Sequence, residues 1–95
     1  MDRQTSPDPW QSLRFELQKQ SEAIFHSTGE VVLVETSEHS EMEMALISRT
    51  KRLKLTYVPE RNAVKWETMQ EYGFDRISEP TAPLASILLR RVHRR

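Results

Sequence analysis

The chain has 95 residues, of which 37% are hydrophobic and 29% charged, and its 14 basic and 14 acidic side chains give a formal net charge of zero. This length and composition predict one globular domain with a single hydrophobic core. The absence of cysteine excludes a disulfide framework, a thiol nucleophile and cysteine-ligated metal sites. The neutral charge balance argues against general attraction to nucleic acid or to an anionic membrane.

The apolar runs are short, with Val31–Val34 and Met44–Ile47 as the longest. Both fall far below the roughly 20 residues of a membrane-spanning helix. The opening residues contain no apolar stretch of the kind found in signal peptides. We therefore expect a cytoplasmic protein that makes no membrane contact.

A long helix is predicted over residues 9–27. Asp8 is a candidate N-cap, Pro9 suits the first helical position, and Gly29 suits the left-handed position that ends a helix. Between these signals, apolar residues recur at helical spacing: Trp10, Leu13, Leu17 and Ile24.

Two strands are predicted next. Residues 30–36 contain four consecutive apolar residues rich in valine, a pattern typical of a strand buried on both faces. Residues 41–48 fit either a short helix, capped by Ser40 and Glu43, or a strand with alternating side chains. The segment is short for a helix, and the hairpin-like link SRTKR leads directly from it to Leu53, so the strand is favoured.

The clearest pattern is LKLTYVPERNAVKWET, residues 53–68, which predicts a β-hairpin. Pro59 and Asn62 have the backbone preferences of a turn. A four-residue loop sets the pairs as follows: Val58 with Ala63, Tyr57 with Val64, Thr56 with Lys65, Leu55 with Trp66, Lys54 with Glu67, and Leu53 with Thr68. A slip of one residue would spoil every pair, so the face that carries Leu55 and Trp66 is predicted to be core.

The remaining segments complete the fold. Residues 72–78 predict a short closing strand, and Thr81 is a candidate cap for a second helix. That helix carries an apolar stripe: Leu84, Ile87, Leu88 and Val92. This order predicts an α+β two-layer sandwich, in which a four- or five-stranded antiparallel sheet has the N- and C-terminal helices packed on one face. Residues 1–7 are predicted to be a disordered N-terminal segment, and residues 8–95 a single α+β domain.

The predicted core combines the apolar faces of these elements. It consists of Trp10, Leu13, Leu17, Ile24, Val32, Val34, Leu53, Leu55, Tyr57, Val64, Trp66, Leu84, Leu88 and Val92.

The sequence contains no recognisable catalytic motif. The three histidines lie outside any nucleophile motif, and two glycines are too few for a phosphate-binding loop. His39, Glu41 and Glu43 alternate and would share one face of an extended strand, which is acceptable chemistry for zinc or manganese. A solvated acidic segment is the favoured interpretation. We expect no enzyme, no cofactor and no metal site.

Two features could contact other molecules. Phe15 falls on the polar side of the first helix and is a candidate protein contact. Basic residues form two clusters, within 49–54 and 90–95, which are candidate nucleic-acid contacts together with one hairpin residue: Arg49, Lys51, Arg52, Lys54, Lys65, Arg90, Arg91, Arg94 and Arg95.

The predicted function is therefore that of a small non-catalytic protein-interaction or assembly domain. A homodimer is favoured over a monomer, with Phe15 or a sheet edge at its interface. Weak nucleic-acid binding through the basic clusters is the less favoured alternative.

Overall fold

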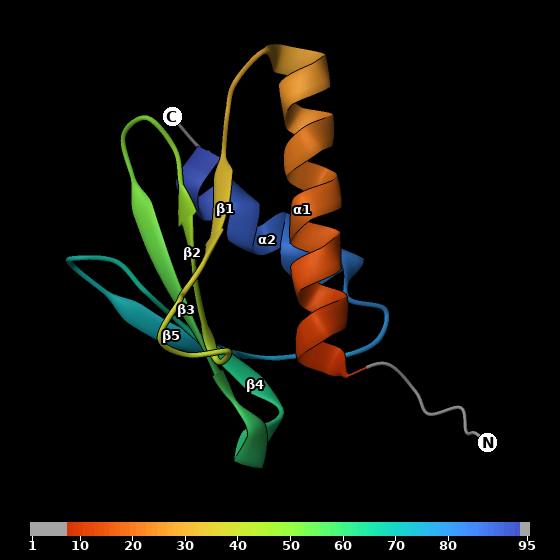
Figure 1. Ribbon diagram of the computed structural model, residues 1–95, viewed down its shortest axis with the longest axis vertical. Coiled ribbons are helices and arrows are strands. Elements are labelled where there is room, and N and C mark those ends of the chain that lie inside the picture. Colours follow the sequence, from red (N-terminus) through yellow and green to blue (C-terminus); the bar gives the residue numbers. More distant parts are fainter. Residues whose placement is uncertain (1–7, 94–95) are drawn as a thin grey trace.

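The computed structural model describes residues 8–93, so the segment 1–7 predicted to be disordered, and also Arg94 and Arg95, lie outside the described residues. The elements in chain order are α1 (Pro9–Thr28), β1 (Leu33–Thr36), β2 (Glu43–Ile47), β3 (Arg52–Val58), the 3-10 turn η1 (Pro59–Arg61), β4 (Ala63–Glu67), β5 (Tyr72–Arg76) and α2 (Ala82–His93). The five strands form one antiparallel sheet in the order β1-β2-β3-β4-β5. Both helices lie on the same side of it, which confirms the predicted α+β sandwich (Figure 1).

Helix α1 begins at the predicted residue and ends at Thr28, one residue later than predicted, with both predicted terminal signals in place. Asp8 Oδ1 accepts a hydrogen bond from Trp10 N at 3.0 Å, which satisfies one of the free amide groups of the first turn. At the other end Gly29 has φ 80°, and its N–H donates to Phe25 O at 2.8 Å. The side chains that α1 buries are Trp10, Leu13, Leu17 and Ser21.

The β3–β4 hairpin has the predicted register. All five pairs from Val58–Ala63 to Lys54–Glu67 are present, whereas Thr68 lies beyond the end of β4, so the predicted Leu53–Thr68 pair is not part of the ladder. Asn62 adopts the left-handed conformation with φ 49°, and its N–H donates to Pro59 O at 3.1 Å. The segment at 41–48 is a strand, as favoured.

The prediction that residues 30–36 are buried on both faces is wrong. Within this segment Val32 is buried, but Val31 is 52% exposed and Leu33 is 54% exposed. β1 is an edge strand, and neither described helix covers the face of the sheet toward which Leu33 points. A valine-rich run therefore indicates a strand here, but its burial depends on what lies above each face.

Helix α2 differs from its prediction in two details. Ile87 is 40% exposed rather than part of the stripe, and the buried residues are Leu84, Ala85, Leu88, Leu89 and Val92. The backbone carbonyl of Thr81 accepts from Ala85 N at 3.0 Å, but the Thr81 hydroxyl donates to Ser12 O of α1 at 3.4 Å. The buried Thr81 thus joins the two helices rather than capping α2 with its side chain.

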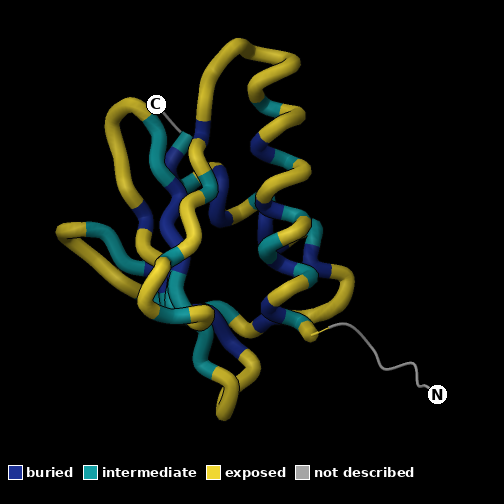
Figure 2. Tube along the Cα trace, in the orientation of Figure 1, coloured by how far each residue is buried: buried dark blue, intermediate teal, exposed yellow. Residues whose placement is uncertain are grey.

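The core fills the space between the helices and the inner face of the sheet, where buried segments from both layers meet (Figure 2). Every predicted core residue is buried or, for Ile24, Val34 and Tyr57, packed against the buried cluster. Trp10 stacks on Tyr57 with ring centroids 5.3 Å apart, and its Nε1 donates to Glu41 O at 2.7 Å. The buried hydrophobic residues that the sequence analysis did not include are Met44, Ala45, Leu46, Ala63, Ile77, Ala85 and Leu89.

Candidate interaction surface

The outer face of the sheet, opposite the helices, is a continuous surface that neither described helix covers. One row crosses all five strands and consists of Glu35, Ala45, Lys54, Glu67 and Tyr72. Opposite charges adjoin along it, as in Lys54 beside Glu67, which is favourable for cross-strand neighbours. Ala45 is only 5% exposed because it lies between longer neighbours, which explains how a residue of the uncovered face is buried.

Two large aromatic side chains project from this face at its β5 edge. Tyr72 is 66% exposed and Phe74 is 44% exposed, and their rings meet edge to face at 6.4 Å. Cations lie over both rings: Lys65 Nζ is 5.2 Å from the Tyr72 centroid, and Arg61 Cζ is 5.2 Å from the Phe74 centroid. We call Tyr72 and Phe74 the β5 aromatic pair.

The packing of Trp66 determines which side chains of β5 point to the outer face of the sheet. Gly73 is its partner on β5, and a Cβ atom added at Gly73 would lie 2.5 Å from Cζ2 of the indole ring. Only glycine leaves room for that ring, so the flanking aromatic residues must point to the outer face. On the inner side, Arg91 of α2 stacks on the Trp66 ring with Cζ 3.9 Å from its centroid.

The sequence analysis did not single out the β5 aromatic pair, although the signal was present. The predicted register already placed Trp66 on the core face. Extending the alternation into YGFDRIS would have placed Gly73 on the core face and both aromatic residues on the other.

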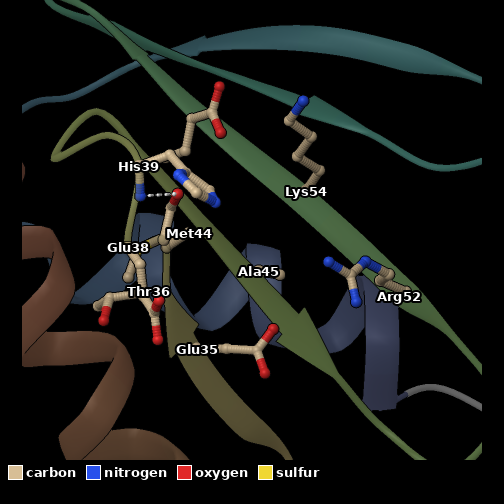
Figure 3. A pocket seen from close by; sticks show the side chains of 10 residues that line it. Glu35, Thr36, Glu38, His39, Met44, Ala45, Arg52 and Lys54 are labelled. Carbon is tan, nitrogen blue, oxygen red and sulfur yellow. Dashed lines mark hydrogen bonds between the residues drawn. The ribbon is translucent and has the colours of Figure 1, made fainter.

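A shallow hollow of about 460 Å³ lies at the other end of the outer face (Figure 3). Arg52 and Lys54 extend into it from β3, and Glu35 and His39 approach from the β1 side, with Ala45 between them. The predicted alternation of His39, Glu41 and Glu43 on one strand is not formed, because β2 begins only at Glu43. No group of three potential metal ligands occurs among residues 8–93.

A second hollow, of about 860 Å³, separates the β2–β3 turn from the β4–β5 turn. Its lining includes five of the predicted nucleic-acid contacts, Arg49, Lys51, Arg52, Lys54 and Arg91, together with Glu67 and Glu71. The fold thus brings Arg91 of the C-terminal cluster to the 49–54 cluster. Lys65, on the outer face of β4, and the exposed Arg90 are not part of the lining. We call this second hollow the hairpin hollow.

Phe15, the predicted protein contact, is 69% exposed. It belongs to α1, which packs against β1 and α2 on the inner side of the sheet, so Phe15 does not share a surface with the β5 aromatic pair. Phe15 and the β5 aromatic pair are therefore separate exposed sites.

No protein-family model matches the chain, and searches of curated proteins and of solved structures find no match either. Neither described helix is both long and apolar enough to cross a membrane.

Proposed function

We propose that the protein is a small non-catalytic protein-interaction or assembly domain that binds its partner through the β5 side of its sheet. The observation that carries this proposal is the β5 aromatic pair, which is exposed on a face that no described helix covers. Aromatic residues and arginine dominate the energetic centres of protein interfaces. Here Tyr72 and Phe74 stand beside Arg61 and Lys65, which supplies both kinds of group.

The positions of the two cations support a protein partner over a nucleic acid. A nucleobase would stack on the ring faces. Lys65 and Arg61 each cover one face of Tyr72 and Phe74, so a base that stacked on either of those faces would have to displace the cation. A protein strand or side chain could approach the exposed ring edges and the open edge of β5 without disturbing either contact.

Site-specific photo-crosslinking tests this proposal. A benzophenone amino acid replaces Phe74 in one variant and Phe15 in a matched control, and both are irradiated in cells that express the full chain. We expect a protein adduct from position 74 that Tyr72→Ser abolishes, and none from position 15. The absence of any protein adduct at position 74 would overturn the proposal. The adduct mass separates a second copy of the chain from a different protein.

A second candidate function, weak binding of single-stranded nucleic acid, has one observation in its favour. The hairpin hollow gathers Arg49, Lys51 and Arg91 from two segments that are distant in sequence. Phosphate contacts made by such a site weaken steeply as salt concentration rises.

Fluorescence anisotropy of labelled single-stranded RNA and DNA tests this second function. Salt-sensitive binding at micromolar protein that Lys51→Gln reduces, and Arg90→Gln outside the hollow does not, would support it. The absence of salt-sensitive binding eliminates it.

A further inference from the structure

We propose that two copies of this chain pair edge to edge along β5, antiparallel about a two-fold axis at Phe74, which joins two five-stranded sheets into one. This inference deepens the proposed assembly function and rests on it, because it identifies the partner as a second copy.

The β5 edge has the free backbone groups that such pairing needs. β5 ends the strand order and pairs only with β4 among the described strands. Just beyond it, Ile77 N donates to Asn62 O at 2.8 Å, in continuation of the β4–β5 register. Since hydrogen-bonded pairs alternate along an antiparallel ladder, Gly73 and Asp75 also turn toward β4. Tyr72, Phe74 and Arg76 therefore direct their N–H and C=O groups to the open edge, which is a template for another strand.

The side chains along this edge are complementary to themselves. A two-fold axis at Phe74 places Phe74 opposite Phe74 of the second copy, and Tyr72 opposite its Arg76. The first is an aromatic pair and the second a cation–π pair, and both lie on the outer face. Gly73 and Asp75 face each other on the inner side, where the Trp66 ring lies over the glycine.

Charge repulsion disfavours the two neighbouring registers, in which the two-fold axis lies at Asp75 or at Gly73. If the axis moved to Asp75, that carboxylate would face its own copy. If it moved to Gly73, Asp75 would face Glu71. Like charges directly opposite one another destabilise a strand pair. The β1 edge is a poorer candidate, because Glu35 lies on it and Glu30 and Glu38 border it.

Two buried polar atoms support the same register. Among the described residues, neither Asp75 Oδ2 nor Arg91 Nε has a hydrogen-bond partner. Buried polar groups usually find partners, so each of these needs an explanation. The proposed pairing brings Asp75 of one copy beside Gly73 of the other, next to the Trp66 ring that Arg91 contacts. The carboxylate of the second copy then lies near a guanidinium of opposite charge, twice in the dimer.

The cysteine-free chain allows a direct test of the axis position. Opposed residues of a hydrogen-bonded antiparallel pair have Cα atoms about 5.5 Å apart, within the range that a disulfide spans. We expect purified Phe74→Cys to form a covalent dimer on mild oxidation at micromolar concentration, and Phe15→Cys to remain unlinked. A Phe74→Cys chain that stays unlinked overturns the proposal.

Sedimentation equilibrium of charge variants supplies the second test. Phe74→Lys and Phe74→Glu each place like charges opposite one another, so we expect the dimer dissociation constant of each to rise about tenfold or more. An equimolar mixture should form a Lys–Glu dimer again, and this restoration also shows that both variants fold. Phe15→Lys is the matched control and should leave the dimer unchanged.

The other outcomes decide between the two proposals. A wild-type chain that is monomeric at tens of micromolar overturns the β5 dimer, as does a dimer that survives Phe74→Lys. If the purified chain is monomeric while position 74 crosslinks to another protein in cells, the interaction function stands without the dimer. If no adduct forms either, both fall.

Discussion

At Gly73 the chain has no room for a side chain, because the Trp66 ring fills the space that a Cβ atom would occupy. We expect Gly73→Ala to destabilise the protein by about 1–3 kcal/mol, the usual range for overpacking. The substitution should also change tryptophan fluorescence, since the indole must move away from Gly73 and its stacking with Arg91 must change. Denaturant unfolding followed by emission measures both effects.

Gly29 provides the control for that experiment. A Cβ atom added there meets nothing within 4 Å, but the backbone has φ 80°. Gly29→Ala should lose about 1–2 kcal/mol through backbone conformation alone. An unchanged emission spectrum in Gly73→Ala would contradict the steric role of Trp66.

Leu55 tests the orientation of the central hairpin. Its side chain is completely buried on the inner face, opposite Trp66. We expect Leu55→Ala to reduce the free energy of unfolding by about 2–4 kcal/mol. The neighbouring Lys54→Ala on the outer face should change it by less than about 0.5 kcal/mol. Equal effects in denaturant melts would mean that the two faces are not distinguished by burial.

At the scale of elements, the contribution of the α1 N-cap to the stability of the protein can be measured by itself. Asp8 provides the side-chain acceptor for Trp10 N. We expect Asp8→Ala to destabilise the protein by about 1 kcal/mol, and Asp8→Asn to retain most of that stability because asparagine caps equally well. Thermal unfolding of the three proteins measures this difference. A loss of similar size in both variants would assign the effect to charge rather than to capping.

Local signals explain which elements could be predicted. The register of the β3–β4 hairpin follows from the alternation on both sides of Pro59 and Asn62, which is information contained within 16 consecutive residues. The exposure of Leu33 and Ile87 could not be predicted in the same way, because it depends on whether another element covers each position. The β5 aromatic pair lies between these cases. Its orientation follows from Trp66 and Gly73, but only once β4 and β5 are known to pair.

The candidate site was predictable only in part for a related reason. The basic residues of 49–54 are visible as a cluster in the sequence, but their meeting with Arg91 requires the crossing of α2 over the sheet. Phe15 was predicted to lie on the polar side of the first helix, and its side chain is exposed there. Its role in contacting a partner stays a prediction.

For the whole molecule, edge pairing would couple stability to concentration. Anything that binds the folded state stabilises it by mass action, and a second copy is no exception. We expect the Tm of the wild type to rise when protein concentration is increased about a hundredfold. The Tm of Phe74→Lys should stay constant over the same range. A concentration-independent wild-type Tm, measured by calorimetry, would contradict stable pairing.

The direct contact between the first and last helices has a consequence for synthesis. Gln20 Nε2 donates to Ala82 O at 3.0 Å and Thr81 reaches Ser12, so α1 is held by residues that emerge from the ribosome more than 60 positions later. The strands pair with their chain neighbours and can associate as they appear. The side of α1 that packs against α2 can be covered only after α2 has been synthesised. During synthesis, the α1 surface that packs against α2 therefore stays uncovered until residues 81–93 have been added.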